Sequence, residues 1–420
     1  MLRILVISRR FYPPWCDGTV SYTKGLVDAI LFLRNLGEDL HLTVLGLTDA
    51  LWFRKWHAFD LVAFKSIPAN VVTLDGSYGN PENITRAYLQ KYSDPVNIAH
   101  VTYPGLDPIS VRMALGMTRA SGIWILKHQY MTLPNNIASV IANRVMDFVS
   151  MGSFLRLKSV FSSNYLENCY SRKRQRVGHA HRANIVPPAI DTERFRRIKI
   201  EGSECVKEIF TAGKIRPQTC DFLDQSDFRI IYFGPLIYER SRYDLILQAV
   251  RRLKEDGISS VSLMMIGRGF EDARCASQIN EYALKIGLSD RIALASMPLA
   301  EIQKISLLNY ADAVLQPYPY IPRQMAIVDP PITVLEAMAA ERKVVVSGLG
   351  SLRDIVDHGS NGFLLPNFEV ASLEETLLQA SAAHGSVGVS ARNTIVQGFS
   401  LPAVAKKLQR LYNTMGMRSK

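Results

Sequence analysis

The sequence predicts an α/β protein built from two doubly wound parallel sheets. Apolar runs of strand length alternate with stretches of helical periodicity along nearly the whole chain, which is the pattern of successive βαβ units. The strands fall into two series, separated by a charged stretch that contains prolines and glycines. The length of 420 residues fits two domains that each bury a core of their own.

The first series occupies the N-terminal half. Between Thr19 and Leu36, apolar residues recur at helical spacing, and Thr19 can cap the first turn of that helix. Helical patterns also separate most of the other strands. The strands expected here are 4–7, 41–47, 71–74, 98–101, 123–127 and 159–161.

The second series begins at Phe228 and forms another doubly wound sheet, not a repeat of the first. The expected strands are 228–234, 261–267, 291–295, 313–316 and 343–347, and the expected helices between them are 243–256, 271–287, 299–310 and 333–340. A proline pair precedes the charged stretch that separates the two series, so we place the domain junction near Pro188.

The composition is that of an ordinary globular protein. Hydrophobic residues make up 48% and charged residues 21%, which excludes disordered, collagen-like and coiled-coil chains. The longest apolar runs fall far short of the roughly 18 residues that cross a bilayer, and the N-terminus reads as a buried strand and not as a signal peptide. The five cysteines are widely spread without a C-x-x-C pair, so a cytoplasmic location fits best.

The charge balance favours anionic partners. Lys and Arg total 49 against 38 Asp and Glu, which gives a formal charge of +11. A basic run at 171–176 is either a solvated loop or an anion-binding face. Together with Trp52, Phe53 and Trp56, this run gives the hypothesis of peripheral contact with an anionic membrane at its inner face. No aromatic-basic interleaving or helix-turn-helix pattern supports a nucleic-acid partner.

Several familiar motifs are absent. The chain has no G-x-x-x-x-G-K-[ST], no H-E-x-x-H, no G-x-S-x-G and no G-x-G-x-x-G after its first strand. The absence of these motifs argues against four classes of protein: P-loop ATPases, zinc proteases, α/β-hydrolases and simple dehydrogenases. There is also no D-x-D pair to hold a divalent cation against a diphosphate, so no bound metal is predicted.

Two loops are candidate anion sites. The proline-rich loop 11–18 follows the first strand and ends at Gly18, where backbone can approach an anion at a helix N-terminus. In the second series, Gly234 ends a strand, and Arg240 and Arg242 precede a helix at the sheet edge where α/β proteins bind ligands. A guanidinium there can clamp a diphosphate with two parallel hydrogen bonds. An ordinary βα loop and solvated arginines are the respective alternatives.

The most specific segment runs from Asp329 to Ala340, with the sequence DPPITVLEAMAA. We expect Glu336 in the first turn of a helix, where the helix dipole favours a carboxylate. A carboxylate there can accept two hydrogen bonds from a ribose diol. A simple capping glutamate is the alternative.

In their order and spacing, these segments resemble the retaining glycosyltransferases of family 4, which have the GT-B fold of two facing Rossmann-like domains. The loop 13–18 looks like that family's P-P-x-x-G-G loop, 186–195 like its hinge, and 336–339 like the E-A-M-A of its E-x7-E motif. The resemblance implies an N-terminal acceptor domain, 1–188, completed by a C-terminal helix at 400–420. It also implies a C-terminal donor domain, 189–399.

The resemblance also implies roles for individual residues. Glu336 would hold the donor ribose, and Arg240 or Arg242, beside Gly234, would bind the diphosphate. Gly18 would belong to the loop shared by donor and acceptor. His128 would lie at the reacting face of the donor sugar; a satisfied histidine at a strand end is the alternative.

Three positions depart from the family pattern. Val328 stands where the first glutamate of the motif contacts the donor sugar, and the neighbouring Asp329 is expected to substitute for it. Pro235 takes the place of an arginine that often follows the glycine, and Glu341 takes the place of a glycine.

The implied function is that of a retaining, metal-independent glycosyltransferase of the hexosyltransferase type. It would move a sugar from a nucleotide diphosphate sugar to a hydroxyl of a glycan or lipid-linked glycan, with no cofactor. Because a fold does not fix a reaction, a nucleotide-sugar epimerase or hydrolase of the same architecture is one alternative. The other, motivated by Val328, is a non-catalytic nucleotide-sugar sensor or partner subunit.

Overall fold

The chain divides into two compact units. The first consists of Met1–Ala189, Pro322–Ile332 and Phe399–Lys420, and the second of Ile190–Ile321 and Thr333–Gly398. The computed structural model describes residues 1–11, 18–48, 65–75, 80–103, 106, 111, 113–115, 123–132, 156–174, 184–198, 204–212, 221–256, 258, 260–267, 270–319 and 327–417.

The first unit contains a seven-stranded parallel sheet in the order β3-β2-β1-β4-β5-β7-β8. All six strands expected in this half are present. The seventh, β8, has only two residues, too few to show an apolar pattern. The bounds are β1 Leu2–Arg10, β2 Leu40–Thr48, β3 Asn70–Asp75, β4 Ile98–Val101, β5 Trp124–Gln129, β7 Leu157–Phe161 and β8 Asn184–Ile185.

The second unit contains a six-stranded parallel sheet in the order β11-β10-β9-β12-β14-β15. Both sheets grow outward from their first strand on one side and then continue on the other, which is the doubly wound order 3-2-1-4-5-6. The predicted fold class is therefore confirmed. The bounds are β9 Phe228–Phe233, β10 Val261–Gly267, β11 Ile292–Ser296, β12 Ala313–Gln316, β14 Lys343–Ser347 and β15 Phe363–Leu365.

Helices connect the strands of each sheet. Those of the first unit are α1 Gly18–Asn35, α4 Pro81–Gln90, α7 Asn164–Arg174 and α17 Leu401–Thr414. Those of the second are α8 Glu204–Ala212, α9 Tyr238–Ser241, α10 Tyr243–Asp256, α11 Phe270–Lys285, α12 Glu301–Tyr310, α13 Ile332–Ala339, α14 Leu352–Ile355, α15 Val370–Ala382 and α16 Ser386–Gly398. Within the described ranges, no helix combines the length and the apolar character that a bilayer crossing requires.

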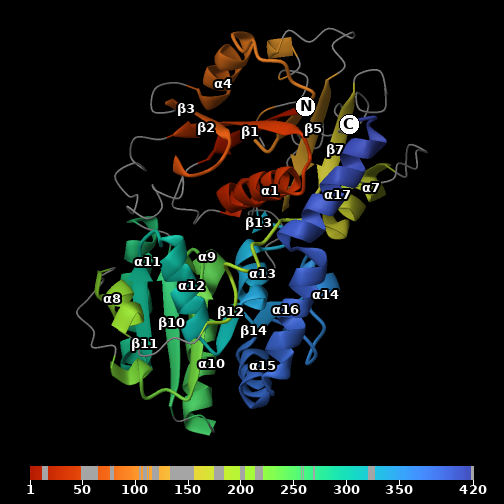
Figure 1. Cartoon of the computed structure of the whole chain (residues 1–420). Coiled ribbons are helices and arrows are strands. Elements are labelled where there is room, and N and C mark those ends of the chain that lie inside the picture. Colours follow the sequence, from red (N-terminus) through yellow and green to blue (C-terminus); the bar gives the residue numbers. More distant parts are fainter. Residues whose placement is uncertain are drawn as a thin grey trace. The chain divides into compact units, whose positions relative to one another are not determined.

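The core of the first unit is closed by the C-terminal helix. Helices α1 and α17 lie side by side (Figure 1), and Val27 and Ile30 of α1 share one buried cluster with Leu408 of α17. On α1, Gly25 allows close packing, because a Cβ there would lie 2.3 Å from the carbonyl oxygen of Ala189. The chain thus returns at its end to cover the sheet that its beginning forms.

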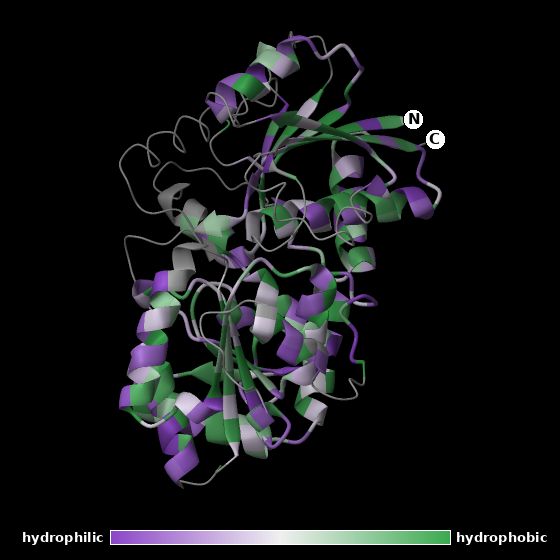
Figure 2. Cartoon of the chain, turned by 90° about the vertical axis from the view of Figure 1, so that its left-hand side faces the viewer, coloured by the Kyte–Doolittle hydropathy of each residue, from purple (hydrophilic) through white to green (hydrophobic). Residues whose placement is uncertain are grey.

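The core of the second unit explains why its strands are apolar throughout. Every residue of β10 is buried, since helices cover both faces of a parallel sheet. Figure 2 shows the strands of this unit coloured as hydrophobic, with hydrophilic patches on the helices around them. Ile230, Leu263 and Leu315, from three neighbouring strands, are completely buried.

A small antiparallel pair extends the first unit. Met131–Thr132 (β6) pairs with Ile327–Val328 (β13), and Val328 lies opposite Met131. Pro322–Ile332 belongs to the first unit, whereas the family resemblance implies a place for it in the domain 189–399. Two-residue strands leave no periodic signal, which is why the sequence does not reveal the exchange.

Candidate functional site

The strand order of the second sheet reverses between β9 and β12, and ligands of doubly wound sheets bind at the carboxyl ends of such strands. Gln316, at the end of β12, is almost fully buried and donates a hydrogen bond of 2.6 Å to the carbonyl of Phe233, at the end of β9. Gly234 follows directly, and a Cβ there would lie 3.0 Å from the hydroxyl of Tyr232. The predicted glycine thus stands at the reversal point in a crowded position.

The two arginines predicted to bind a diphosphate follow this glycine. Arg242 caps α9 with a left-handed φ of 41°. Its guanidinium donates to both carboxylate oxygens of Asp244 at 3.1 Å and lies 5.2 Å from the ring centre of Tyr238. The hydrogen bonds to Asp244 raise the pKa of Arg242. An anion must therefore compete with Asp244 for Arg242. Arg240 lies half-buried on α9 and also has a partner within the protein.

Glu336 lies on α13 and is buried, with 6% of its surface exposed. The expectation that it occupies the first turn is wrong: the helix begins at Ile332, directly after Pro331, so Glu336 is its fifth residue. The dipole of the first turn does not explain a buried carboxylate there. An ion pair does, because Lys304 Nζ of α12 contacts Glu336 Oε2. Burial raises the pKa of Glu336, and Lys304 opposes that rise.

Glu341, which stands where the family pattern has a glycine, lies just after the C-terminal end of α13. Helices commonly end with a glycine in the left-handed conformation, and Glu341 takes that conformation with a φ of 58°. Its carboxylate lies 3.6 Å from Arg197 Nη1. Glu341 therefore occupies a backbone capping position.

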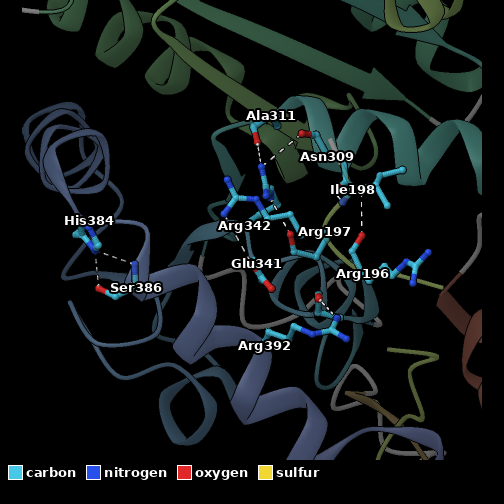
Figure 3. Close-up of polar contacts among 12 residues, drawn as sticks. Arg196, Arg197, Ile198, Asn309, Ala311, Glu341, Arg342, His384, Ser386 and Arg392 are labelled. Carbon is cyan, nitrogen blue, oxygen red and sulfur yellow. Dashed lines mark hydrogen bonds and ion pairs between the residues drawn. The ribbon is translucent and has the colours of Figure 1, made fainter. Parts of the chain in front are cut away.

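Arg342 and Arg392 donate to backbone carbonyl groups at and near the C-terminal end of α13, and Figure 3 shows both side chains. Arg342 is buried and donates to the carbonyl oxygens of Ala340 at 2.9 Å and of Ala311 at 3.0 Å. Arg392, on α16, donates to the carbonyl of Ala339 at 2.7 Å. Burial lowers the pKa of Arg342 to about 10, which still leaves it charged at neutral pH. This cluster closes a helix end, and its buried donors are occupied.

In the first unit, Gly18 begins α1. A Cβ at this position would lie 3.1 Å from Cγ2 of Val328, so the residue in place of the expected glutamate packs directly against the predicted glycine. The rest of that loop, residues 12–17, lies outside the described residues. So do Trp52, Phe53 and Trp56, and the side chains of the basic run 171–176.

Asp329 follows Val328 and is also buried. Its backbone N–H donates to the carbonyl of Tyr130 at 3.0 Å, and its Oδ2 accepts a 2.5 Å hydrogen bond from the hydroxyl of Ser163. Ser163 also accepts from the N–H of Leu166 in the first turn of α7, and Ser162 donates to the carbonyl of Asp329. Asp329 thus ties its segment to the start of α7.

His128 lies in β5 and belongs to a buried chain of hydrogen bonds. Its Nδ1 lies 2.9 Å from the hydroxyl of Tyr22, and its Nε2 lies 2.7 Å from Nδ1 of His100. Nε2 of His100 in turn lies 2.9 Å from the hydroxyl of Tyr412, on α17. All four side chains are buried. Both ring nitrogens of His128 are therefore bonded inside the first unit.

Because a neutral histidine carries one ring proton, the proton count determines which partner donates in each of these hydrogen bonds. If Tyr412 donates to His100, His100 donates to His128 and His128 donates to Tyr22, then the Tyr22 hydroxyl can donate to the carbonyl of Val186 at 3.4 Å. In the opposite direction, the Tyr412 proton has no acceptor among the described residues. Burial lowers the pKa of His100 to about 3 and that of His128 well below its ordinary value, so both rings are neutral.

Four residues of these contacts were not predicted from the sequence: Lys304, His100, Tyr412 and Ser163. Lys304 lies on a helix whose polar positions look like an ordinary solvated face. His100 did carry a signal, since a histidine within the fully buried strand Ile98–Val101 needs polar partners. Those partners come from 28 and 312 residues away, so no local pattern names them.

Comparisons with known proteins bear on this arrangement. Residues 227–382 match the family model described as Glycosyl transferases group 1. No curated protein matches the chain by sequence. A glycosyltransferase from Rickettsia africae is 14% identical with a TM-score of 0.68, over 100% of this chain and 99% of that one. HepE from Anabaena, solved with UDP and glucose, is 14% identical with a TM-score of 0.68, over 99% of this chain and 100% of that one.

Sucrose-phosphate synthase from Thermosynechococcus elongatus gives a similar result, with 15% identity and a TM-score of 0.67 over 99% of both chains. At such identities these likenesses show the fold. The resemblance noted in the sequence therefore holds: the chain has the two-domain GT-B fold of these glycosyltransferases, and residues 227–382 match the group 1 glycosyl transferases.

Proposed function

We propose that the protein is a retaining, metal-independent glycosyltransferase of the hexosyltransferase type. It transfers a sugar from a nucleotide diphosphate sugar to a hydroxyl of a glycan or a lipid-linked glycan. One observation carries the proposal: the match to group 1 glycosyl transferases falls on the unit that contains Gly234, Arg240 and Glu336, whose sheet reverses its strand order between β9 and β12. Carboxyl ends of strands at such a point bind nucleotides in α/β proteins.

The second unit takes the donor. Glu336 accepts hydrogen bonds from the ribose, and Arg240 binds the diphosphate beside Gly234, where no side chain intervenes. Arg242 contributes when the diphosphate replaces Asp244 as its partner. These donors stabilise the charge that develops on the leaving diphosphate, which is electrostatic catalysis of the oxyanion type. The departing phosphate takes the proton of the acceptor hydroxyl, which attacks from the same face and so retains the anomeric configuration.

The first unit takes the acceptor, and we propose its His128 and Asp329 as the catalytic residues. Each is already hydrogen-bonded, so a sugar hydroxyl has to replace a protein partner: Tyr22 at His128 and Ser163 at Asp329. This exchange distinguishes our proposal from a purely structural role for the two residues. It predicts that Ser163→Ala changes KM for the donor, because it removes the hydroxyl with which a sugar hydroxyl competes for Asp329.

The choice of donor to test first comes from the neighbours. HepE from Anabaena was solved with UDP and with UDP-glucose. We therefore propose a uridine nucleotide sugar as the first candidate.

Turnover with product analysis tests the proposal against its rivals. Wild type, Glu336→Ala and the control Glu255→Ala, which alters an exposed ion pair on α10, are incubated with donor and a panel of acceptor glycosides. Release of nucleotide that needs acceptor, is lost only in Glu336→Ala and gives a product of retained configuration supports transfer. Turnover of donor without acceptor identifies an epimerase or hydrolase.

A non-catalytic sensor or partner subunit is the second candidate. It is favoured by Val328, which fills the position of the missing glutamate and packs against Gly18. Such a protein binds donor but gives no turnover with any acceptor.

We also propose a cytoplasmic protein that contacts anionic membranes peripherally, as a lipid-linked acceptor requires. The support is the net charge of +11 and the basic run at 171–176. Co-sedimentation with vesicles containing phosphatidylserine at low salt tests this contact. Recovery of all the protein in the supernatant refutes it.

A further inference from the structure

Glu336 and Lys304 form a buried ion pair at the proposed donor site. They come from α13 and α12, two helices of the second unit, and their side chains keep only 8% and 15% of their surface exposed. Within the described residues, Lys304 is the charged group that contacts the Glu336 carboxylate. A carboxylate removed from water is costly unless it is paired, so this contact determines its charge state.

The two carboxylate oxygens of Glu336 have different surroundings. Lys304 contacts Oε2, whereas Oε1 accepts no hydrogen bond from any residue in the described ranges. An ionised carboxylate offers about four lone-pair sites, and one ammonium contact leaves most of them available. The pair therefore presents a fixed, partly unoccupied acceptor.

A ribose diol consists of two hydroxyl donors, and it needs an acceptor that carries no proton of its own. A protonated Glu336 would present one O–H donor and fewer lone pairs. Burial favours that protonated form, and Lys304 opposes it. Lys304 therefore determines whether the Glu336 carboxylate is ionised and can accept both hydrogen bonds from a ribose diol.

We propose that Lys304 is a positioning residue for nucleotide binding: it holds the Glu336 carboxylate ionised through Oε2 and leaves Oε1 to accept from the ribose diol. The inference rests on the proposed function and deepens it. Neither helix sequence indicates this pairing, because Lys304 and Glu336 are 32 positions apart on separate helices.

The inference predicts a specific dependence on pH. Without the ammonium, the pKa of Glu336 rises further, and nucleotide binding then requires removal of a proton. The ratio of the dissociation constant of Lys304→Met to that of wild type at the same pH should increase about tenfold for each pH unit below the new pKa. A purely structural role for Lys304 would weaken binding by the same factor at every pH.

The experiment is calorimetric titration of the full chain with UDP, and in parallel with GDP and ADP, from pH 6 to 8.5. The variants are Lys304→Met, Lys304→Arg and Glu336→Gln, and Lys304→Gln serves if the methionine variant does not fold. Weak binding at pH 6 that recovers at pH 8.5 in Lys304→Met, with restoration by arginine, supports the inference. In a Glu336→Gln background, Lys304→Met should add no pH dependence.

Two results overturn the inference alone: Lys304→Met binds like wild type at every pH, or its loss is independent of pH. Failure of wild type to bind any of the three nucleotides overturns the proposed function and this inference together. The two failures are therefore distinguishable.

Discussion

Tyr412 anchors the C-terminal helix to the sheet through the buried histidine chain, and removing its hydroxyl tests that chain. Tyr412→Phe keeps the ring and its packing but leaves Nε2 of His100 without its partner at 2.9 Å. A buried polar atom left without its hydrogen bond costs about 1–3 kcal/mol. The first unit contains about 220 residues, a size at which 1 kcal/mol shifts the midpoint by about 2–4 °C. We therefore expect the thermal midpoint of this unit to fall by several degrees.

The assay is thermal and urea unfolding followed by circular dichroism at pH 7.5. Tyr88→Phe is the matched control, because the Tyr88 hydroxyl has no hydrogen bond among the described residues. In a His100→Leu background, Tyr412→Phe should cost less than in wild type, since the partner is already gone. Equal effects of Tyr412→Phe and Tyr88→Phe, or an unchanged cost in the His100→Leu background, would refute the hydrogen-bond chain.

Three further predictions follow from the described contacts. The unfolding free energy should fall as pH drops from about 6.5 towards 3, because the unfolded state protonates His100 and His128, whose pKa values burial lowers in the folded state. In urea unfolding the loss at pH 5 should be about 2 kcal/mol smaller in His100→Leu than in wild type, since only His128 then contributes. Gly388→Ala should lower the thermal midpoint and Gly385→Ala should not, because a Cβ on Gly388 would lie 2.2 Å from a backbone carbonyl oxygen whereas none is within 4 Å of Gly385. Asp244→Asn should strengthen UDP binding in calorimetry, because Asp244 competes with an anion for the Arg242 guanidinium; unchanged or weaker binding would contradict the proposed role of Arg242.

The sheets could be predicted from sequence because their signal is local. Strand Val261–Gly267 and helix Tyr243–Asp256 have the predicted bounds, since buried parallel strands and amphipathic helices leave continuous patterns. Strands β6, β8, β13 and β15 were missed because two or three residues carry no periodic pattern. The assignment of Pro322–Ile332 depended on one of them.

The position of Gly234 at the carboxyl end of a strand was predictable, because a glycine directly after a buried strand is a local signal. The candidate site was not predictable where a side chain acquires its environment from a distant helix. Glu336 was expected to depend on a helix dipole and instead pairs with Lys304. Arg242 was expected to bind an anionic ligand, and in the structure it donates hydrogen bonds to Asp244. Tertiary electrostatics determine such partners, and they leave no trace in local spacing.

The most direct test of the account is the thermal midpoint of the protein in the presence of UDP-, GDP- and ADP-sugars, compared between wild type, Glu336→Ala and Glu255→Ala. A ligand at a hundred times its Kd stabilises the native state by about 2.7 kcal/mol. We predict that one nucleotide sugar raises the midpoint by several degrees in wild type and Glu255→Ala, and not in Glu336→Ala. No shift with any of them, or an equal shift in Glu336→Ala, would contradict a donor site built around Glu336.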